Sequence, residues 1–119
     1  MQNANNANNA NVENGRFSNG LSDAQAERLA LLSEEMGEAV QAVGKILRYG
    51  YASVHPDAPE AGNNRVRLIH EMGDVLAVIQ LIKDAGDLDV GELELAKLDK
   101  LRRIGRYLHH QSVSSCWLT

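Results

Sequence analysis

Two short acidic segments of the chain repeat the same arrangement of carboxylates. The first reads Glu35-Met36-Gly37-Glu38 and the second reads Glu71-Met72-Gly73-Asp74. On a helix, residues three apart lie on one face, so each segment would present two acids beside an apolar stripe that contains its methionine. An antiparallel pair of such helices could therefore bring four carboxylates together across one seam.

Carboxylates at this spacing repel one another, and partial burial adds to the cost. Lys45 is the best protein cation near them, but a divalent metal is the simpler source of compensating charge. Mg²⁺ and Mn²⁺ are hard ions that prefer carboxylate oxygens. Di-iron and zinc sites fit less well, because no histidine has an acid three residues before it and the zinc ligand set differs. The alternative is two solvated acidic faces that never meet.

A basic ridge follows the acidic segments. Lys97, Lys100 and Arg103 are three residues apart, and a metal-holding carboxylate cluster next to such a ridge suits a polyphosphate. An ordinary solvated helix face is the other interpretation of this ridge. Arg48 and Arg67, on either side of a loop, are weaker candidates for phosphate contacts.

Three amphipathic helices are expected to position these residues. Ser22 and Gln25 form a capping-box pair, and the first helix should run from there to a stop at Gly50. The second should run over residues 64–85, and the third from Asp89 to about His110. A loop over residues 50–63 holds both prolines, and no segment alternates as a strand does.

Each predicted helix carries an apolar stripe that we expect to be buried. The stripes are, in order, Leu29, Leu32, Met36, Val40, Val43 and Leu47; Leu68, Met72, Val75, Leu76, Ile79 and Ile82; and Leu95, Leu98, Leu101, Ile104 and Leu108. The fold class is therefore all-α, a bundle of three main helices.

Length and composition set the remaining limits. The chain has 119 residues and a mass of 13.0 kDa, enough for one domain, here residues 21–110. An Asn-rich flexible tail, for which a linker or added leader is favoured over a regulatory role, is expected over residues 1–20, and a short tail over 111–119. The core is thin, so the bundle should be completed by homo-oligomerisation, and small residues along the first helix suit close helix approach.

Charge and cysteine content point to a class of partner and a compartment. The net charge of −4 argues against broad nucleic-acid affinity, and no apolar run is long enough for a membrane span. The single cysteine, Cys116, cannot form an internal disulfide, which fits a reducing cytoplasm.

Taken together, Glu34-Glu35-x-x-Glu38, Glu71-x-x-Asp74 and Lys97-x-x-Lys100-x-x-Arg103 resemble the MazG-type all-α nucleoside triphosphate pyrophosphohydrolases. The resemblance covers about residues 22–108. Residues 45–50 and the Pro-containing loop after them are similar to the short single-domain members of bacteria, phages and mobile elements. The long spacer between the acidic motifs, residues 39–70, departs from that pattern and could shape the base-binding pocket.

The resemblance implies a hydrolase that cleaves an NTP or dNTP between the α and β phosphates, for nucleotide-pool housekeeping. It implies Mg²⁺ as cofactor, with Mn²⁺ as a substitute, and a homodimer or homotetramer. It also assigns roles, with Tyr49 and Tyr51 as weak candidates for the base. The expected metal ligands are Glu35, Glu38, Glu71 and Asp74. Glu34 is a further catalytic residue, as a ligand, a water-orienting base or a supporting group. The expected phosphate contacts are Lys97, Lys100, Arg103 and Lys45.

Three alternative functions stay open at this point. A related enzyme on the same scaffold would take phosphoribosyl-ATP or a dUTP-like substrate. A non-enzymatic helical module would use its acidic seam for a basic partner, or the chain would be a purely structural helical oligomer. Release of pyrophosphate that depends on Mg²⁺ separates the enzymes from the other two.

Overall fold

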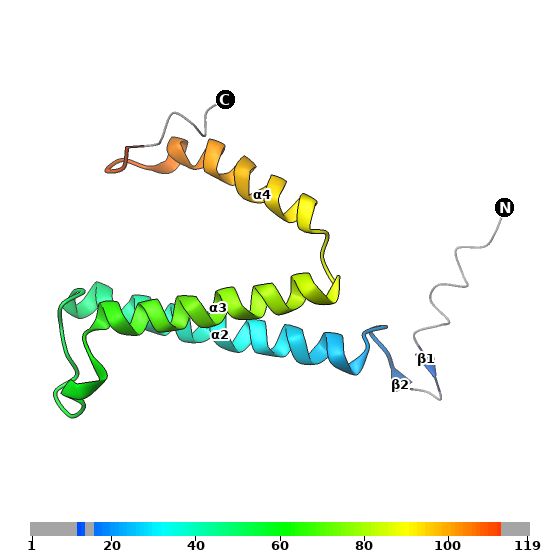
Figure 1. Cartoon of the computed structure of the whole chain (residues 1–119), viewed down its shortest axis with the longest axis horizontal. Coiled ribbons are helices and arrows are strands. Elements are labelled where there is room, and N and C mark those ends of the chain that lie inside the picture. Colours follow the sequence, from blue (N-terminus) through cyan, green and yellow to red (C-terminus); the bar gives the residue numbers. More distant parts are fainter. Residues whose placement is uncertain (1–11, 14–15, 113–119) are drawn as a thin grey trace. The chain divides into compact units, whose positions relative to one another are not determined.

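The computed structural model describes residues 12–13 and 16–112, and three α-helices dominate it (Figure 1). These are α2 (Asp23–Tyr49), α3 (Asn64–Ala85) and α4 (Val90–Arg103), with short 3₁₀ turns η1 (Pro59–Ala61) and η2 (Ile104–Tyr107). The all-α fold with three main helices is confirmed. No helix among the described residues is long and apolar enough to cross a membrane.

One small strand pair departs from the expectation of no sheet. β1 (Val12–Glu13) and β2 (Arg16–Phe17) pair antiparallel, with Val12 opposite Phe17. The segments are too short to show alternation in the sequence. Most of the two expected tails, residues 1–11, 14–15 and 113–119, lies outside the described residues.

The predicted boundaries of the first two helices are confirmed. At the start of α2, the Ser22 hydroxyl accepts from the Gln25 backbone N–H at 3.1 Å, and the Gln25 side chain accepts from the Ser22 N–H at 2.9 Å. Gly50 ends α2 with φ 87°, a conformation that glycine adopts without strain. These caps fix the phase of the helix that carries the first acidic segment.

The third helix begins as expected but ends earlier. The Asp89 carboxylate caps it by accepting from the Glu92 N–H at 2.8 Å. The α-helix ends at Arg103, not near His110, and the chain tightens into η2, which contains Gly105. Glycine is a poor helix former, which accounts for the change of helix type at this point.

The buried residues differ from the expected stripes. Ala39, Ala42, Val75, Val78 and Ile82 form the core, with Ile82 only 3% exposed. Most of the residues expected inside α2 are exposed, as are several in the other helices: Leu29, Met36, Val40, Val43, Leu47, Met72, Leu76, Leu95 and Leu98. Helices α2 and α3 each bury only one narrow face against the other, so α3 leaves most of the wide apolar face of α2 uncovered.

The loop between α2 and α3 is held by backbone and side-chain hydrogen bonds. Val54 and Asn63 form an isolated antiparallel bridge, and the N–H of Asn64 donates to the Ser53 carbonyl at 2.9 Å. The buried Asn64 amide donates to the Gly50 carbonyl at 3.0 Å. The two ends of the loop are thereby tied together at the first residue of α3.

We predict that Asn64→Ala lowers the free energy of unfolding by about 1–3 kcal/mol, because it leaves the Gly50 carbonyl without this donor in a half-buried place. Gln80→Ala is the matched control. It removes an amide hydrogen bond of similar length, 2.8 Å to Asp84, but an exposed one within a single helix. Its expected cost is about 0.5 kcal/mol or less. Urea melts measure both, and equal losses would contradict the structural role of Asn64.

Candidate active site

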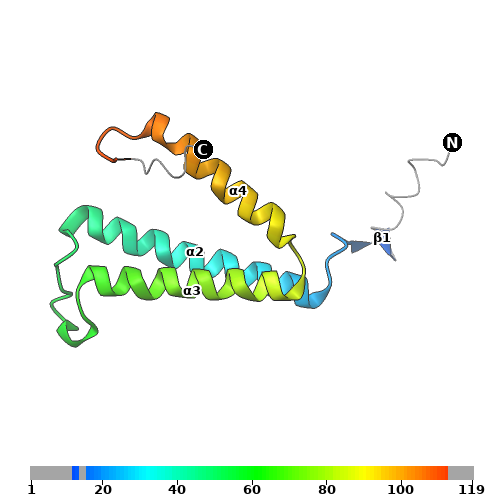
Figure 2. The ribbon, with the colours of Figure 1, turned by 45° about the horizontal axis from the view of Figure 1, so that its top comes forward.

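The two acidic segments meet because α2 and α3 run side by side in opposite directions, joined by the loop at one end (Figures 1 and 2). One carboxylate oxygen from each of Glu35, Glu71 and Asp74 lies within 4.8 Å of the others. Glu38 joins this group through a hydrogen bond with Glu71. The structure therefore brings together all four residues of the repeated motif.

Glu35 is the most constrained of these carboxylates. Its Oε2 atom is buried and has no hydrogen-bond partner among the described residues. Desolvation raises the pKa of Glu35 above its ordinary 4.5, and the negative charges of Glu38, Asp74, Glu34 and Glu71 raise it further. A buried acceptor without a donor is unfavourable, and a bound cation would satisfy it.

Glu38 shows the same crowding in another form. Its hydrogen bond to Glu71, followed by the charge of Glu71, raises the pKa of Glu38 above 4.5. Such a bond between two carboxyl groups needs a proton on one of them, so protons compete with a cation for this site. Glu34 is exposed and contributes charge next to Glu35 but is not one of the three converging carboxylates.

The spacing of the cluster suits a small divalent ion. Two oxygens that bind one Mg²⁺ at about 2.1 Å are at most about 4.2 Å apart. The observed upper limit of 4.8 Å is close to this span, so small side-chain adjustments would give it. The all-oxygen donor set and the unpartnered Oε2 of Glu35 fit a hard cation such as Mg²⁺ or Mn²⁺.

A small hollow of about 180 Å³ adjoins the cluster, and acids and bases line it together. Glu38 and Glu71 form its acidic side, and Lys45 and Arg67 its basic side. Gln41 and Ala42 complete the wall. Lys45 lies about 10 Å along α2 from Glu38, at 1.5 Å per residue, so positive charge follows the acids toward the loop.

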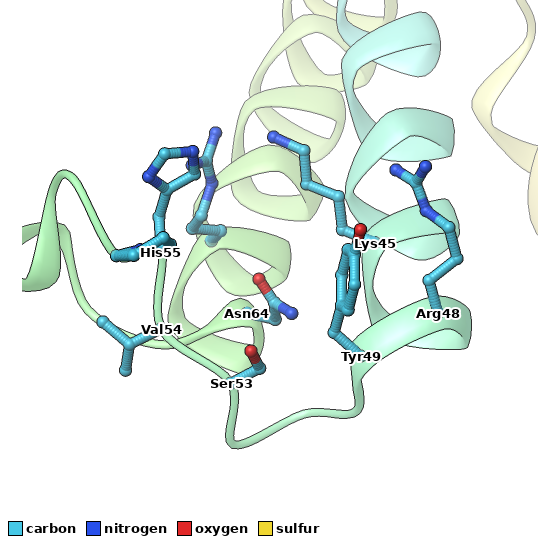
Figure 3. Close-up of a pocket in the computed structure, with 9 residues that line it drawn as sticks. Lys45, Arg48, Tyr49, Ser53, Val54, His55 and Asn64 are labelled. Atoms are coloured by element: carbon cyan, nitrogen blue, oxygen red, sulfur yellow. The ribbon is translucent and has the colours of Figure 1, made fainter.

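A larger cavity of about 440 Å³ lies at the loop end of the hairpin, and Lys45 and Arg67 line it too. Figure 3 shows Lys45, Arg48 and Tyr49 on the α2 side and Val54 and His55 on the loop side, with Ser53 and Asn64 between them. Its lining residues are Lys45, Arg48, Tyr49, Ser53, Val54, His55, Pro56, Asn64 and Arg67. The lining contains no carboxylate.

The predicted basic ridge lies on α4, in a second compact unit formed by residues 80–119. Lys97 pairs with Glu94 at 2.6 Å, and Arg103 pairs with Asp99 at 2.8 Å. Lys100 is exposed. Two of the three bases thus already have a carboxylate partner on their own helix, and a phosphate-binding role for the ridge stays a prediction.

Several residues of the loop-end cavity were not singled out by the sequence. His55, Ser53 and Asn64 gave no signal, since single polar residues in a loop are common. Arg48 and Arg67 were weaker candidates because they bracket the loop, and the structure places both in the cavity wall. The unusual length of the loop was the one available indication.

Comparison with protein families identifies the class of this protein. The family model described as the MazG nucleotide pyrophosphohydrolase domain matches residues 24–107. The match covers well over half of the chain, so the chain belongs to this family, and the resemblance drawn from the acidic motifs is confirmed. Members are usually dependent on a divalent metal, which accords with the carboxylate cluster. Comparison with curated proteins gave no match, and comparison with solved structures gave none either.

The raised pKa of Glu38 predicts a pH dependence of stability in the presence of chelator. The folded state holds this proton more tightly than the unfolded state, so the stabilisation is present below pH 4.5 and is lost as pH rises through the raised folded pKa. The free energy of unfolding of the parent, relative to Glu38→Gln, should therefore fall as pH rises above 4.5.

Glu94→Gln is the control with the opposite sign. The Lys97 hydrogen bond and charge lower the pKa of Glu94, so its stabilisation is present above pH 4.5 and is lost as pH falls through the lowered folded pKa. Thermal or urea melts at several pH values measure both slopes. If the free energy of unfolding relative to the parent changed with pH in the same direction for both variants, the crowding of carboxylates at Glu38 would be contradicted.

Proposed function

We propose that this protein is a Mg²⁺-dependent nucleoside triphosphate pyrophosphohydrolase that converts an NTP or dNTP to the monophosphate and pyrophosphate. The observation that carries the proposal is the convergence of Glu35, Glu71 and Asp74 within 4.8 Å, next to a hollow lined by Lys45 and Arg67. Family membership gives the class of reaction.

The carboxylates would act as the metal ligands. Glu35, Glu71 and Asp74 converge, and Glu38, which is hydrogen-bonded to Glu71, would join them. When bound, Mg²⁺ supplies positive charge to phosphate oxygens and makes a nearby water more acidic. The exposed carboxylate of Glu34 stands beside this group, where it is available to orient that water or to accept its proton.

In the proposed reaction, water would form a bond to the α phosphorus while the bond from that phosphorus to the oxygen bridging the α and β phosphates breaks. Negative charge then develops on the departing pyrophosphate. Lys45 and Arg67, at the boundary of the two hollows, would stabilise negative charge on the phosphate groups of the substrate. Lys97, Lys100 and Arg103 of α4 remain proposed phosphate contacts in addition.

Product analysis tests the reaction directly. With Mg²⁺ and a panel of NTPs and dNTPs, including dUTP and phosphoribosyl-ATP, we expect equal amounts of monophosphate and pyrophosphate from at least one substrate. Chelator should abolish the activity. Stepwise release of orthophosphate as the main product, or no metal-dependent product from any substrate, would contradict the proposed function.

Asp74→Asn tests the metal ligands, because it removes both charge repulsion and a ligand. Without metal, the variant should be as stable as the parent or slightly more stable. With Mg²⁺ or Mn²⁺, the parent should gain stability by mass action and the variant should gain less. Activity should fall by about a hundredfold or more, since metal-assisted charge stabilisation is worth several kcal/mol.

Asp84→Asn is the matched control for this substitution. Asp84 lies on the same helix, is exposed, and accepts a hydrogen bond from Gln80. It should keep full activity and the parent's metal-dependent shift in melting temperature. If Asp74→Asn behaves like Asp84→Asn in both measurements, the metal-site assignment is wrong.

A homodimer or homotetramer is part of the proposal. The uncovered apolar face of α2 includes Val40 and Leu47, which are 69% and 82% exposed. Among the described residues, a Cβ at Gly37 or Gly44 would meet nothing within 4 Å, so packing against α3 does not require glycine there. Light scattering at micromolar concentration should give at least twice the 13.0 kDa chain mass. A monodisperse 13.0 kDa species would refute the assembly.

A further inference from the structure

We infer that the loop-end cavity is the pocket for the nucleoside of the substrate, with Lys45 and Arg67 holding phosphates at its boundary. The inference rests on the proposed function, because it fixes which way a nucleotide lies relative to the carboxylate cluster. It also gives the long loop, residues 50–63, a specific role in substrate selection.

The first argument is the order of charges along the hairpin. Carboxylates come first, then the small hollow that Glu38 and Glu71 share with Lys45 and Arg67, then the larger cavity without acids. Among the described residues, Lys45, Arg48 and Arg67 form no ion pair. A phosphate chain that starts at the metal ligands would thus meet its next positive charges at Lys45 and Arg67.

The second argument is size. The small hollow of about 180 Å³ is lined by charged residues and suits phosphate groups, whereas the loop-end cavity of about 440 Å³ is within the usual range for small-molecule sites. Pyrophosphate alone would leave much of the larger cavity empty. A nucleoside attached to the phosphates would occupy it.

The third argument is the chemistry of the rest of the cavity wall. Tyr49, Val54 and Pro56 offer flat or apolar surface, and Ser53 and Asn64 offer polar groups. The Arg48 guanidinium lies over the Tyr49 ring, 5.3 Å from its centroid, and the Tyr49 residue is 64% exposed. Aromatic and guanidinium planes are common stacking surfaces for nucleic-acid bases.

His55 adds a directed donor to this wall. The Asp57 backbone N–H donates to His55 Nδ1 at 3.2 Å, so in the neutral imidazole the hydrogen is on Nε2. Nε2 is then free to donate to an acceptor of a base or sugar. The backbone bridge between Val54 and Asn63 ties this segment to the other end of the loop.

The test measures equilibrium binding rather than turnover. Calorimetric titrations with Mg²⁺ present would use AMP, GMP, CMP, UMP and dTMP, and separately pyrophosphate, on the parent, Tyr49→Leu and Tyr51→Leu. Tyr51 was the second candidate for the base in the sequence, but it does not line the cavity. It is the matched control, because it is a nearby exposed tyrosine that contacts Arg65 instead.

We expect Tyr49→Leu to weaken binding of the preferred monophosphate about tenfold, the order of one lost stacking contact, and to change pyrophosphate binding less than twofold. Tyr51→Leu should leave both unchanged. Tyr49→Phe keeps the aromatic ring, so its affinity for the preferred monophosphate should equal that of the parent. If Tyr49→Leu does not fold, a loss of monophosphate binding in Tyr49→Phe would still contradict stacking on the ring.

Three results would overturn the inference. One is loss of pyrophosphate binding with unchanged monophosphate binding in Tyr49→Leu, which would make the cavity a phosphate site. The others are equal effects of Tyr49→Leu and Tyr51→Leu, and no binding of any monophosphate at millimolar concentration. Tyr49-dependent binding without release of pyrophosphate from any NTP would instead leave this pocket intact and refute the proposed function.

Discussion

Electrostatic repulsion among carboxylates on two facing helices is the constraint that the candidate site must satisfy. Glu35, Glu71 and Asp74 are held within 4.8 Å by helices whose facing surfaces include the small residues Ala39 and Ala42. Protons relieve part of the repulsion, as the raised pKa values of Glu35 and Glu38 show. The buried Oε2 of Glu35 has no hydrogen-bond partner among the described residues, and a divalent cation would satisfy it.

The loop between α2 and α3 lines the cavity next to the carboxylate cluster. Its ends are held together by the Asn64–Gly50 hydrogen bond and the Val54–Asn63 bridge, so contacts within the chain shape the cavity that the loop lines. Lys45 and Arg67 place positive charge between the acids and that cavity. In the proposed site, the surfaces for the cation, the phosphates and the nucleoside would follow one another along the hairpin, as a metal-bound nucleotide requires.

Sequence patterns predicted the helices and the acidic cluster because both depend on short-range spacing. The Ser22–Gln25 capping box and the repeated acids three residues apart are local signals, and the structure confirms the helices and the meeting of the acids. The buried faces were predicted less well. Val75 and Ile82 are inside, but Met36, Val40 and Leu47 are exposed, since periodicity marks an apolar face without saying what covers it. The loop-end cavity depends on contacts between residues far apart in the sequence, such as the Asn64–Gly50 hydrogen bond, and no short-range pattern predicts them.

Proton release on metal binding tests the central claim most directly. At about pH 5, titration of Mn²⁺ into the protein in two buffers of different ionisation enthalpy measures the protons displaced per ion bound. The account predicts net proton release by the parent and less release by Glu38→Gln, because protons on the crowded carboxyls must leave when the cation enters. Absence of Mn²⁺ binding, or binding with equal heats in both buffers, would contradict it.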